Sequence, residues 1–409
     1  MLQGKTVLLA VTGGIAAYKM PNVARMLKKM RCQVHVLMTE NATNFITATT
    51  FETLTGNKCL IDTFDRNFEF SVEHVALAKQ ADLVLVAPAT ANIIGKIAGG
   101  LADDMLSTTV MACTCKTLIA PAMNHNMYHN PIVQDNLQKL ENFNYSIILP
   151  DKGMLANGDI GDGKLPSEEV LVEHILRELA CEKDLQGQKV LVTAGATREA
   201  IDPVRYITNH STGKMGYALA RQAMLRGAEV TLVSGAAAIQ PPMFVEMVNV
   251  VTAEEMYQAV TARAASADII IKAAAVADYR PAEAAEDKIK KAGAAASIAL
   301  EPTRDILAEL GRRKEKREIH AFLCGFSMET RDLVDNSRRK LQKKHLDLVA
   351  ANNLKVEGAG FGTDTNVLTL ITDTQTISLD KMSKEEAADK VLDAILENIR
   401  RKSDGKNIS

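Results

Sequence analysis

Residues 5–14 read KTVLLAVTGG, an aliphatic run that stops at two glycines, and residues 189–195 repeat the pattern as KVLVTAG. In each half of the chain a helical pattern follows, and then a second aliphatic run, at 33–39 and at 229–234. Short aliphatic runs that alternate with helical patterns are typical of parallel strands in a sheet covered on both faces. The sequence therefore predicts the α/β class, with two doubly wound, Rossmann-like domains.

The order of these patterns also predicts the domain boundaries. Residues 182–188 are polar and separate the two halves, as expected of a linker. We expect a first domain at 1–181, a second domain at 189–402 and a polar tail at 403–409. A chain of 409 residues has room for two or three domains of ordinary size.

Composition argues against several classes of function. The net charge is −2, Trp is absent and aromatic residues make up 4%, so nothing indicates a nucleic-acid partner. The apolar run at the N-terminus is too short to cross a membrane, so no membrane partner is expected. The six cysteines include no C-x-x-C pair, which favours reduced thiols over disulfides or a metal site. We expect a cytoplasmic enzyme.

Three strand ends in the first half carry small and polar residues. Gly13–Gly14 follow the first strand, APATAN occupies 87–92 and IAPAMN occupies 119–124. Ligands of open α/β sheets bind at the carboxyl ends of strands, and N–H groups at a helix start can hold a phosphate. We therefore expect one pocket there, although the two glycines alone fit a tight turn equally well. A lone histidine such as His74 is more often structural than catalytic.

Taken together, these features resemble those of the flavin-dependent cysteine decarboxylases. The matching features are His74, the PAMN segment at 121–124 and the loop at 156–164, which follow one another in the order of that family. The resemblance implies a flavodoxin-like domain with bound FMN, whose ring accepts the electrons that decarboxylation needs. It implies that His74 is the base for the substrate thiol or the partner of its carboxylate, and that Asn124 holds the carboxylate. The implied FMN contacts are Gly13, Gly14, Thr39, Thr90, Asn92 and Ser107.

The loop departs from the family pattern at Asn157, which stands where the family has a proton-donating cysteine. A thiol with a pKa of about 8.5 can donate a proton near neutral pH, whereas a carboxamide cannot. We expect this chain to oxidise and decarboxylate its substrate but to complete the last protonation poorly. For the first domain the alternative is a flavin-binding subunit without full turnover. A pair of NAD(P)-binding modules is disfavoured, because neither half contains G-x-G-x-x-G.

The second half contains a polar turn at a predicted helix start, with the sequence TNHSTGKMG at 208–216. Gly213–Lys214 is not followed by Ser or Thr, so the turn is not a P-loop, although it can still bind anions. Asp278 follows a small-residue strand end and fits either a Mg²⁺ ligand beside a triphosphate or a turn cap. Basic clusters at 287–291 and at Lys340 and Lys344 are usually solvated faces when taken alone.

These segments, together with DPVR at 202–205 and AAAVADY at 273–279, resemble the phosphopantothenate–cysteine ligases. The resemblance implies that Asn209 addresses the substrate carboxylate and that Asn209 and Lys288 act in catalysis, with Asp278 as the Mg²⁺ ligand. The implied 4′-phosphopantothenate contacts are Arg205, Asn209, Ser211, Gly213 and Gly216. The implied nucleotide contacts are Ala273, Ala274, Ala275, Asp278, Lys288, Arg304, Asp305, Ile306, Leu307, Phe326, Lys340 and Lys344.

The two resemblances fit one another, since the ligase makes 4′-phosphopantothenoylcysteine and the decarboxylase consumes it. The whole chain resembles the bifunctional enzymes of coenzyme A biosynthesis. This implies ligation of cysteine to 4′-phosphopantothenate through an acyl-cytidylate, with CTP and Mg²⁺, and then decarboxylation to 4′-phosphopantetheine. The fusion favours CTP over ATP. The family also implies a homo-oligomer with dimeric ligase domains and trimeric decarboxylase domains, up to a dodecamer.

Overall fold

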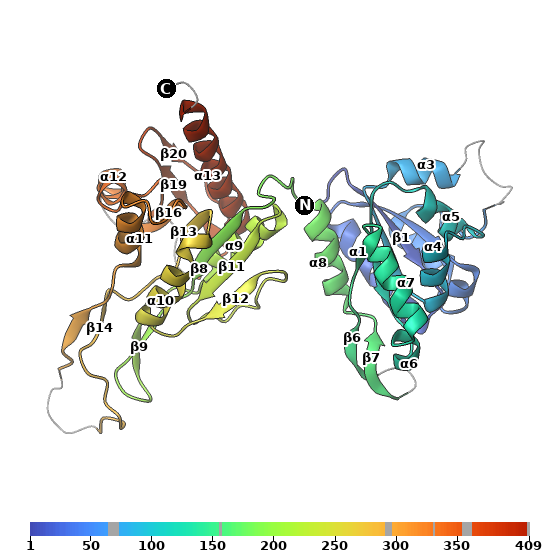
Figure 1. Ribbon diagram of the computed structural model, residues 1–409, viewed down its shortest axis with the longest axis horizontal. Coiled ribbons are helices and arrows are strands. Elements are labelled where there is room, and N and C mark those ends of the chain that lie inside the picture. Colours follow the sequence, from blue (N-terminus) through green and yellow to red (C-terminus); the bar gives the residue numbers. More distant parts are fainter. Residues whose placement is uncertain (64–72, 155–157, 291–296, 330–331, 354–361, 407–409) are drawn as a thin grey trace. The chain divides into compact units, whose positions relative to one another are not determined.

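The computed structural model describes residues 1–63, 73–154, 158–290, 297–329, 332–353 and 362–406. The chain divides into two compact units, Met1–Glu182 and Lys183–Ser409, which are described separately (Figure 1). None of the described helices combines the length and the apolar composition needed to cross a membrane.

The first unit is built on a parallel sheet of strand order β2-β1-β3-β4-β5. Its strands are β1 (Thr6–Val11), β2 (Gln33–Met38), β3 (Leu83–Ala89), β4 (Lys116–Pro121) and β5 (Ser146–Ile147). This is the flavodoxin-like order, in which the connections reverse direction between β1 and β3 and leave a crevice for a ligand at that point.

Helices cover both faces of this sheet. Leu8 and Ala10 of β1 belong to a core with α4, α5 and α7, while Val7 and Leu9 point to the opposite face, where α1 and α8 pack. All four side chains are fully buried. The helices are η1 (Ile15–Lys19), α1 (Met20–Lys29), η2 (Glu40–Asn44), α2 (Ala48–Thr55), α3 (Glu73–Gln80), α4 (Ala91–Gly99), α5 (Met105–Ala112), α6 (His125–Tyr128), α7 (Pro131–Asn142) and α8 (Glu168–Leu179).

A hairpin of β6 (Asp151–Met154) and β7 (Ile160–Lys164) stands apart from the first sheet and lies beside α6 (Figure 1). The Met123 N–H donates to the Gly163 carbonyl at 3.0 Å, which ties β7 to the segment after β4. This hairpin carries the loop at 156–164, so the fold brings part of that loop to the carboxyl end of the sheet.

The second unit contains a sheet of order β12-β11-β8-β13-β16-β17-β19-β20. Its strands are β8 (Lys189–Ala194), β11 (Glu229–Ser234), β12 (Glu246–Asn249), β13 (Ile269–Lys272), β16 (Phe322–Glu329), β17 (Leu348–Asn353), β19 (Leu368–Ile371) and β20 (Thr376–Ser378). The first six strands are parallel, and β19 and β20 extend one edge in antiparallel pairing, which the sequence pattern did not predict.

Helices again cover both faces. The helices α10 (Ala253–Arg263), α11 (Ile306–Glu315) and α12 (Leu333–Lys343) share one core, and α9 (Lys214–Leu225) packs with α13 (Lys384–Lys406). The remaining elements are β9 (Arg198–Ala200), β10 (Tyr206–Thr208), η3 (Ala264–Ser266), β14 (Tyr279–Pro281), β15 (Leu300–Pro302), β18 (Thr365–Asn366) and β21 (Met382–Ser383). The prediction of an α/β protein with two doubly wound domains is confirmed.

Candidate active sites

The first unit has a pocket of about 640 Å³ at the carboxyl ends of its strands. It brings together four residues predicted from sequence, Gly13, Gly14, Thr90 and Asn124. Its other lining residues are Ile15, Ala16, Tyr18, Lys19, Pro88, Ala91, Ala122, Met123, Met127, Met154, Gly163, Lys164 and Leu165. The pocket therefore lies at the β1/β3 reversal point, with the β6–β7 hairpin along one side.

Hydrogen bonds of the Thr12 hydroxyl to Pro88 and Thr90 connect the ends of β1 and β3. The Thr12 hydroxyl donates to the Pro88 carbonyl at 2.5 Å and accepts from the Thr90 N–H at 3.2 Å. Thr90 is also the N-cap of α4, because its hydroxyl accepts from the Ile93 N–H at 3.4 Å. The two strand ends are thus held together around the pocket.

The predicted phosphate-binding corner has the chemistry that an anion requires. The buried Thr39 hydroxyl at the end of β2 has no hydrogen-bond partner in the described part of the chain. A Cβ on Gly13 would come within 2.6 Å of Asn41 Cβ, so only glycine lets the β1 end approach η2 this closely. Gly14 precedes the first turn of η1, which has no side-chain cap. An unpaired hydroxyl and uncapped backbone N–H groups are the donors that a phosphate group accepts from.

Three other residues predicted for the first site, His74, Asn92 and Ser107, do not line this pocket. His74 is half-buried on α3, and Asn92 is exposed on α4. Ser107 is buried at the start of α5, where its N–H donates to Asp104 at 2.7 Å in a capping box. Asn157 lies outside the described residues. Within one chain, the fold therefore assembles only part of the predicted set.

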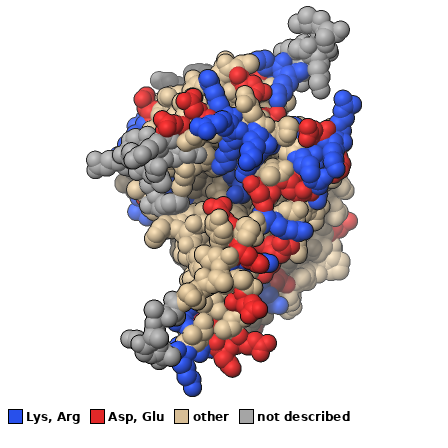
Figure 2. Space-filling model, turned by 90° about the vertical axis from the view of Figure 1, so that its left-hand side faces the viewer, with Lys and Arg blue, Asp and Glu red and all other residues tan. Residues whose placement is uncertain are grey.

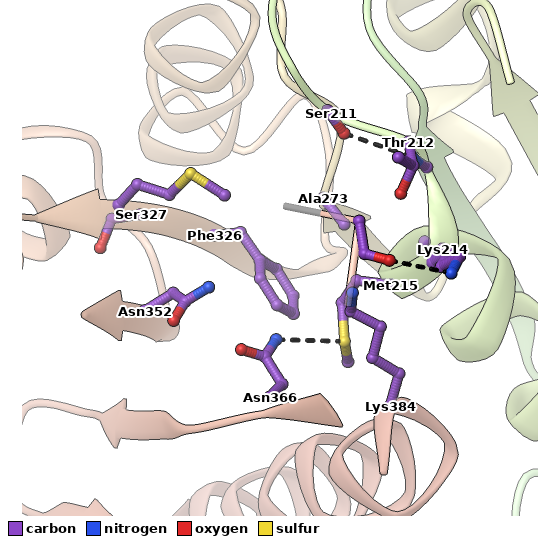
Figure 3. Close-up of a pocket in the computed structure, with 14 residues that line it drawn as sticks. Ser211, Thr212, Lys214, Met215, Ala273, Phe326, Ser327, Asn352, Asn366 and Lys384 are labelled. Atoms are coloured by element: carbon purple, nitrogen blue, oxygen red, sulfur yellow. Dashed lines mark hydrogen bonds between the residues drawn. The ribbon is translucent and has the colours of Figure 1, made fainter. Parts of the chain in front are cut away.

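The second unit has a pocket where the polar turn before α9 meets the ends of β13, β16 and β17 (Figure 3). Five predicted residues line it, namely Ser211, Gly213, Gly216, Ala273 and Phe326. Figure 3 shows the Phe326 ring pointing toward Asn366 and Met215. The other lining residues are Thr212, Lys214, Met215, Ser327, Met328, Asn352, Gly362, Asn366 and Lys384.

Two glycines allow this turn to lie against the sheet. Gly213 has a φ of +81°, a left-handed conformation that side chains rarely adopt, and it is the N-cap of α9. A Cβ on Gly216 would lie 2.5 Å from Ala194 Cβ at the end of β8. Because α9 approaches β8 this closely, its uncapped N-terminal N–H groups reach the strand-end pocket.

Polar contacts connect the predicted substrate and nucleotide segments. The Asn209 amide donates to the Ala275 carbonyl at 3.1 Å. The buried Asp202 carboxylate accepts from the Arg205 guanidinium, and the Ile289 N–H donates to it at 3.1 Å. The hydrogen bond from Arg205 holds the pKa of Asp202 well below its usual range. Arg205 thus anchors the segment that carries the exposed Lys288.

Three lysines and one carboxylate gather at the ends of β13, α11 and α12. The Lys344 ammonium pairs with Asp305 at 2.6 Å, and Lys340 donates to the Phe326 carbonyl at 3.3 Å. Burial lowers the pKa of the Lys272 ammonium to about 8, and the neighbouring Lys340 acts in the same direction. Positive charge therefore exceeds negative charge here, as expected of a polyphosphate site.

Lys272 was not among the predicted site residues, although the sequence shows it as the lysine that ends the aliphatic run of β13. Figure 2 shows Lys and Arg side chains gathered in the upper part of one face, with Asp and Glu side chains among them. Basic residues end both helices of this region, with Arg312, Arg313 and Lys314 on α11 and Lys340 and Lys343 on α12. Arg312 and Lys343 are exposed, and Arg313 and Lys314 pair with Glu309 and Asp347. The candidate site is therefore limited to Lys272, Lys340 and Lys344.

The other residues predicted to contact the nucleotide differ in how exposed they are. Asp278 is exposed beyond β13. Ile306 and Leu307 are buried in the core under α11, so only their backbone can reach a ligand. Arg304 pairs with Glu254 at 3.1 Å and stacks on the Tyr257 ring of α10. Ala274 is buried, while Ala273 and Ala275 are half-buried.

Two family models match this chain, one over each unit. The family model described as Flavoprotein matches residues 1–180, and the DNA/pantothenate metabolism flavoprotein C-terminal domain matches residues 185–399. The chain is 44% identical over 399 residues to the coenzyme A biosynthesis bifunctional protein CoaBC of Bacillus subtilis (strain 168), covering 97% of each chain. It is 46% identical over 371 residues to CoaBC of Vibrio vulnificus (strain YJ016), covering 90% of this chain and 92% of that protein. A crystal structure of the C-terminal domain of CoaBC matches with 38% identity and a TM-score of 0.45, covering 54% of this chain and 98% of that one.

Proposed function

We propose that this chain, which belongs to the family of coenzyme A biosynthesis bifunctional proteins, ligates cysteine to 4′-phosphopantothenate in its second unit and decarboxylates the product in its first. The observation that carries the proposal is the presence in one chain of a lysine-rich anion site and a flavodoxin-like strand-end pocket. The first can activate a carboxylate with a nucleotide, and the second can hold a flavin. The overall product is 4′-phosphopantetheine.

For the ligase we propose CTP as the nucleotide, as the fusion of the two units favours. The carboxylate of 4′-phosphopantothenate attacks the α-phosphate, pyrophosphate leaves, and the amine of cysteine then displaces CMP from the acyl-cytidylate. Lys272, Lys340 and Lys344 stand where they can neutralise charge that builds on the phosphate oxygens. Lys288 is proposed to act beside them in catalysis.

Asp278 is the proposed Mg²⁺ ligand. Mg²⁺ is usually bound by one or two carboxylates together with substrate phosphates and water, so a single exposed carboxylate beside the lysine cluster fits this use. The polar turn before α9 would hold the phosphate of 4′-phosphopantothenate through Ser211, Gly213 and Gly216, and Asn209 would address its carboxylate.

For the decarboxylase we propose FMN with its phosphate at Gly13, Gly14 and Thr39. The buried, unpaired Thr39 hydroxyl supports this placement, because such a group needs a hydrogen-bond partner. FMN supplies the electron sink for loss of CO₂. Asn124 lines the pocket, where its amide can hold the substrate carboxylate. With Asn157 in place of the family's cysteine, we propose that the final protonation is slow.

We propose a homo-oligomer that works in the cytoplasm, where a thiol substrate stays reduced. His74 and Asn92 lie outside the pocket of their own chain, so a neighbouring copy would bring them to a flavin site. In the second unit the hairpins β9–β10 and β14–β15 expose Tyr206, Tyr279 and Leu300, which fits a dimer contact (Figure 1).

The test is a mass-spectrometric product assay with 4′-phosphopantothenate, cysteine, CTP and Mg²⁺, in which pyrophosphate and flavin absorbance are also followed. Pyrophosphate together with 4′-phosphopantothenoylcysteine and some 4′-phosphopantetheine supports both activities. No pyrophosphate with either CTP or ATP would rule out the ligase. Ligation without any flavin absorbance or CO₂ loss would rule out the decarboxylase.

A further inference from the structure

The β6–β7 hairpin meets α6 through two histidines and one carboxylate that neither proposed reaction uses. His125 begins α6, His129 follows one turn later as its C-cap, and Asp162 lies on β7. His129 Nε2 lies 2.9 Å from Asp162 Oδ2, and His125 Nδ1 lies 4.0 Å from the same oxygen. One donor atom of each residue lies within 4.8 Å of the other two.

Two glycines hold Asp162 in this position. A Cβ on Gly161 would come within 2.8 Å of the His125 ring, and a Cβ on Gly163 would overlap the Met123 carbonyl oxygen. The Asp162 N–H donates to His125 Nδ1 at 3.2 Å. The backbone on both sides of Asp162 is therefore pressed against the start of α6, and its carboxylate is kept close to both imidazole rings.

This donor set has the chemistry of a transition-metal site. Two imidazoles and one carboxylate suit first-row divalent cations such as Zn²⁺, Co²⁺ and Ni²⁺. Donor atoms that each bind a metal at about 2.1 Å can be up to about 4.2 Å apart. Both separations from Asp162 Oδ2, 2.9 Å and 4.0 Å, fall within that limit. A bound ion would take the place of the proton shared by His129 and Asp162. It would also replace the hydrogen bond that the Asp162 N–H donates to His125. Because the site is partly exposed, water can complete the coordination of the ion.

We propose that His125, His129 and Asp162 form a binding site for Zn²⁺ or a similar first-row divalent cation that fixes β7 against α6. The site adjoins the first-unit pocket, since Asn124, Met127 and Gly163 line that pocket beside the three ligands. The ion orders one wall of the pocket and takes no part in bond breaking. The proposal goes beyond the two proposed reactions and does not depend on them.

The test is a calorimetric titration of the full-length, FMN-loaded protein, without an affinity tag, with ZnCl₂ in excess Mg²⁺. Mg²⁺ prefers oxygen ligands, so it fills the nucleotide metal site and leaves the imidazoles available. We expect stoichiometric binding of one Zn²⁺ per chain. Loss of a partner outside the ligand shell already lowers metal affinity about 10- to 100-fold, so Asp162→Asn and His129→Ala should each weaken binding by at least about tenfold.

Two control variants make the result specific. His345 also pairs with a carboxylate, Glu315 at 3.6 Å, but forms no three-donor group in the described part of the chain. Cys115→Ser controls for binding by the neighbouring thiols of Cys113 and Cys115. Both His345→Ala and Cys115→Ser should keep the wild-type affinity. Unchanged binding by Asp162→Asn, or loss of binding in either control, overturns the proposal.

If a ligand variant folds poorly, hydrogen exchange on the wild-type protein gives a second answer. Zn²⁺ should slow exchange of the backbone amides at 160–164, because opening of β7 then requires release of the ion. Exchange that is the same with and without Zn²⁺ would also overturn the proposal.

Discussion

The Lys344 ammonium lies 2.6 Å from the Asp305 carboxylate, at the point where the end of α12 meets the first turn of α11. Burial acts to raise the pKa of Asp305, but the hydrogen bonds from Lys344 and the Ala308 N–H, together with the positive charges of Lys344 and Lys272, outweigh it and the pKa is lowered. Asp305 also caps α11 through the Ala308 N–H at 3.0 Å. One lysine is therefore held in place by a carboxylate that is itself fixed by the helix.

We expect Lys344→Met to weaken the use of CTP. A hydrogen bond to a charged group contributes about 1.5–3 kcal/mol, so the KM for CTP should rise about tenfold or more in a pyrophosphate-release assay. Lys343→Met is the matched control, since Lys343 is the adjacent lysine and is exposed. Equal effects of the two substitutions would show that Lys344 has no special role.

CTP affinity should depend on pH through Lys272, whose pKa is lowered to about 8 by burial and by Lys340. A bound polyphosphate favours the charged ammonium, so affinity should be full below pH 8 and fall as the pH rises above it. Calorimetry between pH 7 and pH 9.5 measures this loss. In Lys272→Arg the affinity for CTP should stay nearly constant over this pH range, because a guanidinium stays charged. In Lys272→Met the affinity should be low at every pH. If the wild-type protein bound CTP with the same affinity and the same pH dependence as Lys272→Met, Lys272 would have no role in CTP binding.

Arg226 should be a main source of stability in the second unit. Its side chain is 6% exposed, and its guanidinium contacts Asp184 at 2.5 Å, Asp393 at 2.9 Å and Asp389 at 3.0 Å. Arg226→Met leaves a partly buried carboxylate unpaired and should lower the free energy of unfolding by about 3–5 kcal/mol. Urea denaturation followed by ligase activity measures the change.

The control for this prediction is Arg401→Met. Arg401 pairs with Glu397 at 2.7 Å on the exposed face of α13, and such a pair contributes less than about 1 kcal/mol. If both variants unfold at the same urea concentration, the buried cluster adds no stability.

Asn157→Cys should speed formation of 4′-phosphopantetheine and leave pyrophosphate release unchanged, because a thiol restores a proton donor and the ligase unit is not altered. Stopped-flow flavin absorbance and product mass spectrometry measure the two halves of the reaction. Asn157→Ser is the control, since a hydroxyl of similar size is too weak an acid. A turnover rate that does not change in Asn157→Cys would mean that another group supplies the proton.

Much of both candidate sites could be predicted from sequence, because their residues stand in short continuous segments. Gly213 and Gly216 stand in one turn, and the fold places that turn against β8. Gly13, Gly14 and Thr90 follow strand runs, and parallel strands bring their carboxyl ends to one edge. The positions of His74 and Asn92 outside the pocket did not follow from sequence, because the direction of a helix relative to a sheet depends on packing.

Periodicity is a property of short segments, so the sequence alone was sufficient for the α/β class and the two-unit organisation. The pair of reactions was implied by the resemblance of its motifs to two known families. Only the tertiary structure decided which charged residues, far apart in the sequence, lie close to one another. Lys272 lies near Lys340 because β13 pairs with β16, whose Phe326 carbonyl accepts a hydrogen bond from Lys340. Arg226 meets Asp393 because α9 packs on α13. His129 meets Asp162 because the glycine-flanked β7 folds onto α6. Such pairs arise from strand order and helix packing, which join residues that no local pattern connects.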